Sequence, residues 1–102
     1  MDVAPETLAD LAAAARILAA RGVVDGFGHV SMRHPSKPDH FIMSRALAPA
    51  LVEPSDICEY GPDSEGVDAD QPKGFLERYI HGEVYRARPD VGAVVHSHSP
   101  SV

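Results

Sequence analysis

The feature that most constrains this chain is an apolar run that ends in two histidines one residue apart. Residues 91–95 are Val-Gly-Ala-Val-Val, and His96 and His98 follow. Such a run favours a β-strand, and alternate side chains on a strand share a face, so both imidazoles leave the same face. Two imidazoles in that position can bind a divalent metal such as Zn²⁺. The pattern by itself also fits two surface histidines in a loop.

The composition restricts the classes of protein to which the chain can belong. Its 102 residues are enough for one small domain, and its 44% apolar and 24% charged residues are typical of a soluble globular protein. The net charge of −6 argues against a nucleic-acid binder, which needs a basic surface. No apolar run approaches the roughly 20 residues of a membrane span, and no signal peptide is recognisable. The single cysteine, Cys58, fits a reducing cytoplasmic location.

Hydrophobic periodicity predicts two helices. Over residues 6–20, apolar side chains recur every three or four positions, as on an amphipathic helix that serves packing. Residues 75–87 are predicted to form the second helix, with an apolar stripe of Leu76, Tyr79, Ile80, Val84 and Ala87. Glu77 and His81 lie one turn apart on this helix. A strand then leads to the paired histidines, so the fold could bring Glu77 towards them.

Three short segments between these helices are predicted to be strands. Residues 29–33, 41–44 and 57–60 carry alternating or apolar side chains and are bounded by glycine, proline and aspartate. The first two strands are expected to pair antiparallel. Two histidines between them, His34 and His40, are expected to be exposed loop residues.

Polar residues beside these segments are candidates for binding a substrate. Residues 26–28 lack the third glycine of a dinucleotide-binding turn. Their glycines would let a ligand approach the backbone closely, or could form only a hairpin turn. Arg45, at the end of the strand 41–44, could hold a carboxylate or phosphate bidentately, or could be solvated. Glu77 could complete a Glu/His/His metal set with the paired histidines, or could simply face solvent.

Several motifs resemble those of the class II aldolase and adducin-head family. Residues 28–33 (Gly-His-Val-Ser-Met-Arg) resemble the family's G-N-[IV]-S-x-R turn, and Ser44 with Arg45 lies where the family has a substrate loop of small residues. Residues 77–90 carry the E-x-x-x-H and Y-x-x-R-P-D patterns, and residues 93–98 match A-[VI]-[VI]-H-x-H. The chain, residues 1–102, is therefore identified as a member of this family, as the N-terminal part of its domain.

The resemblance implies an α/β fold, a three-layer α/β/α sandwich around a mostly antiparallel central sheet. It implies that His96, His98 and Glu77 bind a divalent metal, Zn²⁺ first and Mn²⁺ or Co²⁺ as alternatives, with Glu77 also the catalytic acid or base. The implied reaction is carbon–carbon bond cleavage, by an aldolase or decarboxylase, through a metal-stabilised enolate or enediolate. The substrate would be a small carboxylate or a sugar derivative, bound by His29, Ser31, Ser44 and Arg45.

Three departures from the family pattern qualify these expectations. His29 replaces the usual asparagine of the turn, and Phe75 and Leu76 stand where sugar-phosphate aldolases carry two small hydroxyl residues. A sugar phosphate is therefore the less expected substrate. The residues around Arg45 and Glu77 look closer to the branch that contains a 3-hydroxy-2-methylpyridine-4,5-dicarboxylate decarboxylase. The family's distal histidine does not occur before Val102, so the domain is expected to be truncated at the C-terminus.

The resemblance leaves other functions open. Family active sites lie between subunits, so a homotetramer is expected of the full-length protein. A non-catalytic binding or assembly domain like the adducin head would share the fold, and an inactive truncated product is a third reading. The presence of Glu77, His96 and His98 together favours the enzyme, because a structural head has no need of metal ligands.

Overall fold

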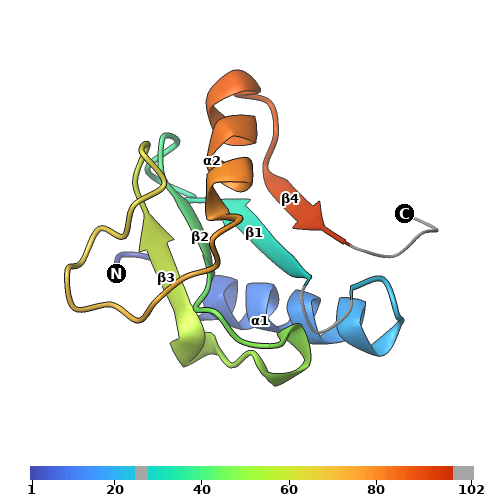
Figure 1. Ribbon diagram of the computed structural model, residues 1–102. Helices are drawn as coiled ribbons and strands as arrows, with labels where there is room; N and C mark the ends of the chain where they lie inside the picture. Colours follow the sequence, from blue (N-terminus) through green and yellow to red (C-terminus); the bar gives the residue numbers. More distant parts are fainter. Residues whose placement is uncertain (25–27, 98–102) are drawn as a thin grey trace.

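The computed structural model describes residues 1–24 and 28–97 (Figure 1). In chain order its elements are α1 (Pro5–Ala20), β1 (His29–Arg33), β2 (Phe41–Ser44), β3 (Ile57–Tyr60), α2 (Arg78–Ala87) and β4 (Ala93–His96), with two 3₁₀ turns at Pro49–Leu51 and Pro54–Asp56. Within the described residues, neither helix has the length and apolar character needed to cross a membrane. The predicted strands are confirmed, and the predicted first helix begins one residue earlier than expected.

The strands form one antiparallel sheet in the order β3-β2-β1-β4. Ser31 of β1 lies opposite Met43 of β2 and opposite Val94 of β4, and His29 lies opposite His96. The predicted antiparallel pairing of the first two strands is therefore confirmed. The same register places the start of β1 beside the end of β4, which brings two histidines from distant parts of the chain together.

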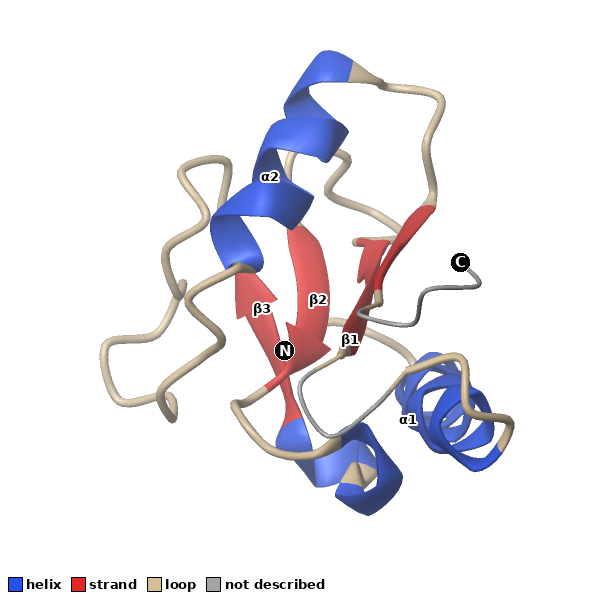
Figure 2. Ribbon diagram, turned by 45° about the vertical axis from the view of Figure 1, so that its right-hand side comes forward, coloured by secondary structure: helices blue, strands red, loops and turns tan. Residues whose placement is uncertain are grey.

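The two helices cover opposite faces of this sheet (Figure 2). The α1 face is packed with Leu11, Ala12 and Ala15 of α1 against Val30, Ile42 and Ile57 of the strands. The α2 face is packed with Tyr85 of α2 against Phe41, Met43, Cys58 and Tyr60. Because strand side chains alternate between faces, β2 and β3 each contribute to both clusters. The expected three-layer α/β/α arrangement is confirmed.

The ends of α1 follow from local backbone chemistry. Pro5 occupies the first helical position, where its missing N–H and fixed φ cost nothing. After the last turn, Gly22 adopts a φ of 72°, a left-handed conformation that glycine takes without steric penalty. This glycine lets the chain leave α1 and return towards the sheet.

The second helix differs from the prediction in its start and in its buried face. It begins at Arg78 rather than at residue 75, and the predicted apolar stripe faces outwards: Leu76 is 74% exposed, Tyr79 44% and Ile80 48%. The buried residues are instead His81, Gly82 and Tyr85. The apolar stripe therefore did not identify the packed face, because hydrogen bonds from the sheet hold the polar His81 inward.

The close approach of α2 to the rest of the fold depends on one glycine. A Cβ atom built on Gly82 would lie 1.8 Å from Ser64 Oγ and 3.1 Å from Ser64 Cβ. Real Cβ atoms do not come this close to a neighbour, so a larger residue would push α2 outwards. Gly82 thus fixes the depth at which the neighbouring His81 enters the core.

Candidate functional site

His29 is the centre of the candidate site. It is the first residue of β1 and is only 2% exposed. Its ring stacks on that of His96, with centroids 4.8 Å apart and planes 12° apart, and lies 4.7 Å from the ring of Phe75. Its Nε2 atom is 3.6 Å from the Oε1 atom of Glu77. The fold therefore brings together three of the predicted site residues, Glu77, His29 and His96.

Glu77 owes its position to the start of α2. It is the residue immediately before the helix, and its side chain is 45% exposed. A carboxylate is favourable at this end of a helix because the backbone N–H groups there are unpaired and carry partial positive charge. Glu77 is thus both accessible to a ligand and placed against the buried His29.

Of the three predicted metal ligands, the described residues include Glu77 and His96. His96 ends β4 and is partly buried on the α2 face of the sheet, beside His29. His98 lies outside the described residues. Glu77 and His96 are a carboxylate and an imidazole, the donor types that divalent metals such as Zn²⁺ take. The donor set present in the described residues therefore fits a metal.

The predicted substrate-binding residues separate into three surroundings. Arg45 follows β2 at the same end of the sheet as His29; its Nε atom donates to Asp56 Oδ1 at 2.8 Å, and its side chain is 43% exposed. Ser31 is fully buried on the α2 face. Ser44 is buried on the α1 face, where it lines a small cavity with Leu11. The side chain of Ser44 therefore lies on the opposite face of the sheet from that of Ser31.

Behind His29 lies a chain of buried hydrogen bonds, which we call the His29 cluster: His29, His81, Ser31 and Tyr85. His29 Nδ1 lies 2.6 Å from His81 Nε2, and His81 Nδ1 lies 2.6 Å from Ser31 Oγ. Ser31 Oγ is in turn 2.8 Å from the Tyr85 hydroxyl. His81 thus links His29 to Ser31. The part of Tyr85 was missed, although its spacing of four residues from His81 places both on one helix face.

Burial decides the protonation of this cluster. The pKa of His81 is lowered from 6.5 to about 3, first by burial and then by the neighbouring His29 and His96. Burial also raises the pKa of Tyr85. At neutral pH both groups are therefore uncharged, and each of their hydrogen bonds needs one donor and one acceptor.

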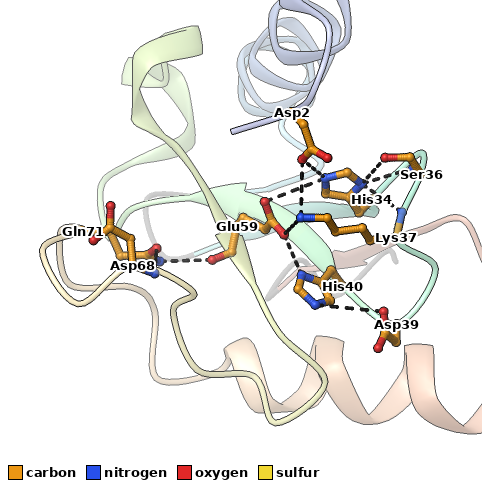
Figure 3. A network of polar contacts seen from close by, with 9 residues as sticks. All are labelled: Asp2, His34, Ser36, Lys37, Asp39, His40, Glu59, Asp68 and Gln71. Atoms are coloured by element: carbon orange, nitrogen blue, oxygen red, sulfur yellow. Dashed lines mark hydrogen bonds and ion pairs between the residues drawn. The ribbon is translucent and has the colours of Figure 1, made fainter.

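A second group of polar residues surrounds the buried Glu59 on the other side of the molecule, and we call it the Glu59 cluster: Asp2, His34, Lys37, His40 and Glu59 (Figure 3). His34 is 2% exposed and His40 is partly buried, so the prediction that both are exposed loop residues is wrong. The reason is Glu59 of β3, whose carboxylate is 5% exposed and bonds His40 Nδ1 at 2.5 Å. A buried carboxylate holds its cationic and N–H partners around it.

Asp2, His34 and Glu59 stand close enough together to suggest a metal site. The position of the ring proton of His34 argues against a metal there. The backbone N–H groups of Ser36 and Lys37 donate to His34 Nδ1 at 3.1 Å each, so the neutral ring carries its own proton on Nε2. That Nε2–H points to Asp2 Oδ1 at 3.0 Å. The atom that would bind a metal is thus already a donor, and the Lys37 ammonium lies 3.6–3.7 Å from both carboxylates.

Comparison with known proteins agrees with this fold. Residues 9–102 match the family described as "Class II Aldolase and Adducin N-terminal domain". Decarboxylase tropJ of Talaromyces stipitatus is 46% identical over 88 residues, which are 84% of this chain and 33% of that protein. The 3,4-dihydroxyphthalate decarboxylase of Arthrobacter keyseri is 36% identical, over 90% of this chain and 40% of that protein.

The solved structures are similar in the same way. An L-fuculose 1-phosphate aldolase from Glaciozyma antarctica PI12 superposes with a TM-score of 0.79 at 31% identity, over 93% of this chain and 41% of that one. The chain thus spans between a third and about two fifths of the length of these relatives. The matched family covers nearly the whole chain, and the chain belongs to the class II aldolase and adducin N-terminal domain family.

Proposed function

We propose that this chain carries part of the active site of a metal-dependent decarboxylase that acts on a hydroxylated aromatic carboxylate. The observation that carries the proposal is the meeting of Glu77, His29 and His96 at one end of the sheet, from three separate elements. The family supports a carbon–carbon lyase, and the named decarboxylases among the relatives favour loss of CO₂ over aldol cleavage.

The metal would be held by Glu77 and His96, joined by His98, the second histidine of the sequence motif. Carboxylate and imidazole donors suit Zn²⁺, with Mn²⁺ and Co²⁺ as alternatives. When bound, such a metal polarises an oxygen of the substrate and favours the build-up of negative charge there. The remaining tasks, binding and protonation, fall to side chains.

Glu77 is the group that we assign to proton transfer. Loss of CO₂ breaks the bond between the ring carbon and the carboxyl carbon, and the electron pair stays on the ring carbon. That carbon must then take up a proton. When it is not bound to the metal, Glu77, half exposed beside His29, can take a proton from solvent, deliver it to the ring carbon and end as the carboxylate. A glutamate that faced only bulk water would have no reason to lie against a buried histidine.

The surroundings of His29 support an aromatic rather than a sugar-phosphate substrate. The Phe75 ring, 4.7 Å from that of His29, presents an apolar surface where a sugar would need hydroxyl partners. Asp56 holds the Nε–H of Arg45, so the two terminal nitrogens of the guanidinium can serve a substrate carboxylate. We therefore propose Arg45 and His29 as the anchors of the substrate.

The test is a comparison of two reactions on the natural protein purified with its metal. We expect CO₂ release from 3,4-dihydroxyphthalate, measured by coupled assay, and no cleavage of L-fuculose 1-phosphate. Cleavage of the sugar phosphate alone would overturn the proposal. Replacement of His96 by alanine should remove both the metal, by elemental analysis, and the CO₂ release, whereas the same change at His40 should leave the metal content unchanged.

The second candidate function is a binding module of the adducin type. The exposed apolar residues of α2 and the turn before it, Leu76, Tyr79 and Ile80, favour it, since such a surface suits a protein partner. A protein that binds no metal and turns over neither substrate, but assembles through this face, would support this candidate instead.

A further inference from the structure

The buried His29 cluster raises the question of which way its hydrogen bonds run. Tyr85, Ser31 and His81 form an unbroken series of contacts at 2.6–2.8 Å that ends at His29. Each hydroxyl and each neutral imidazole in it has one hydrogen to donate. The series can therefore run in one direction or the other, and the direction decides which nitrogen of His29 carries the proton.

The inner end of the series favours one direction. Tyr85 is 5% exposed, and among the described residues Ser31 is the one side chain within hydrogen-bond distance of its hydroxyl. If Ser31 donated to Tyr85, the hydrogen of the buried phenol would have no acceptor, which is costly. Tyr85 therefore donates to Ser31.

The rest of the direction follows from this first step. Ser31 accepts from Tyr85 and donates to His81 Nδ1, which leaves the single proton of neutral His81 on Nε2. His81 Nε2–H then donates to His29 Nδ1. A neutral His29 whose Nδ1 is an acceptor carries its proton on Nε2. The burial that keeps His81 uncharged supports this sequence.

The outer end agrees with the inner end. His29 Nε2 lies 3.6 Å from Glu77 Oε1. An N–H at Nε2 faces the carboxylate favourably, whereas a bare nitrogen there would face it with a lone pair. The contacts of Tyr85 and those of Glu77 therefore indicate the same arrangement of protons independently.

We propose that Tyr85, Ser31 and His81 are positioning residues that fix His29 as an Nε2–H hydrogen-bond donor towards the ligand site beside Glu77. His29 then cannot coordinate a metal through Nε2 or act as a base there. It can bind an anionic oxygen, such as that of an aromatic carboxylate. This last step rests on the proposed function, but the direction of the hydrogen bonds does not.

The direct test is the tautomer of the two histidines. In ¹⁵N-labelled full chain at neutral pH, long-range ¹H–¹⁵N correlation spectra of the imidazoles distinguish a protonated ring nitrogen from a bare one. We expect protons on Nε2 of both His29 and His81. A proton on Nδ1 of His29, or on both of its nitrogens, would overturn the proposal whether or not any variant folds.

A matched pair of serine variants tests the link. Ser31→Ala removes the contact between Tyr85 and His81, and we expect the His81 and His29 nitrogen signals to move towards the average of the two tautomers. Ser44→Ala removes another buried serine, from the other face of the sheet, and should leave these signals unchanged. Unchanged signals in a folded Ser31→Ala chain would show that the series does not set the tautomer.

A separate kinetic experiment tests the effect of this arrangement on substrate binding. In the natural metal-loaded protein, Ser31→Ala should raise the KM for an aromatic carboxylate by about tenfold, the loss expected for one charge-assisted hydrogen bond. The metal content should be unchanged. If no substrate is turned over, the proposed function fails while the tautomer result stands; if the tautomers are wrong but decarboxylation proceeds, only this inference fails.

Discussion

The His29 cluster and the Glu59 cluster have similar residues but differ in which residue is buried. Each contains two histidines. Glu59 belongs to the Glu59 cluster, and Glu77 lies beside the His29 cluster. In the Glu59 cluster the glutamate is buried, and two histidines and Lys37 surround it within the protein. In the His29 cluster the histidines are buried and the glutamate, Glu77, is half exposed. The Glu59 carboxylate has its partners within the protein, whereas the Glu77 carboxylate, beside the His29 cluster, is accessible to a ligand.

This difference teaches how to separate a structural cluster from a candidate site. Distances between ligand atoms favour Asp2, His34 and Glu59 as a metal site. The donors and acceptors around them favour the opposite conclusion. The Lys37 ammonium lies beside both carboxylates, and the backbone N–H groups at His34 Nδ1 leave the ring proton on Nε2, the atom that a cation would need. Proximity alone is a weaker signal than the number of protein partners that each polar atom has.

The largest expected difference between Glu77 and Glu59 is in catalysis. Replacing Glu77 with glutamine should lower kcat for decarboxylation by about 10²- to 10⁴-fold, the usual contribution of an acid–base group. Steady-state CO₂ release measures it. Glu83→Gln, an exposed change on the same helix, is the control and should retain kcat within about twofold. Equal losses in the two variants would end the assignment of Glu77.

The largest effect on stability is expected from pH. Because the pKa of His81 falls from 6.5 to about 3 on folding, the unfolded chain binds more protons between these values. The stabilisation from neutral, buried His81 is therefore complete above pH 6.5 and is lost as the pH falls towards 3. Urea unfolding at several pH values should show this slope, and His81→Gln should flatten it. An identical slope in the variant would assign the acid sensitivity to other groups.

A change within the Glu59 cluster should cost less, and should cost stability rather than activity. Glu59→Leu leaves His34, Lys37 and His40 without their shared carboxylate, and we expect a loss of about 3 kcal/mol in the free energy of unfolding. Glu6→Leu, an exposed position on α1, should change it by no more than about 0.5 kcal/mol. If Glu59→Leu abolished metal binding in a folded protein, the two clusters would have been assigned the wrong way round.

The smallest effect concerns the contact that seats His81. Gly82→Ala forces Ser64 or α2 to move, and we expect a loss of about 2 kcal/mol in the free energy of unfolding. Gly92→Ala is the matched control, because nothing lies within 4 Å of a Cβ there. Thermal unfolding of the two variants is sufficient. An unchanged free energy of unfolding for Gly82→Ala would mean that α2 can move outwards at little cost.

Much of the fold could be predicted from the sequence, because its signals are local. Alternation and breakers defined the strands 29–33, 41–44 and 57–60, and the motif at Glu77, His96 and His98 carried the family resemblance that the comparison then confirmed. The buried face of α2 could not be predicted. Its apolar stripe suggested the wrong side, since the contacts that bury His81 come from strand residues about 50 positions away.

The sequence by itself determined the strands, the first helix, the family and the residue types at the candidate site, because these depend on side chains close together in the chain. Only the tertiary structure decided which polar residues meet. The pairing of β1 with β4 places His29 on His96, and the approach of α2 places His81 between His29 and Ser31. It also decided that His34 is buried and that Ser44 lies on the opposite face of the sheet from Ser31. Burial and hydrogen-bond direction depend on neighbours distant in sequence, and those are fixed by packing.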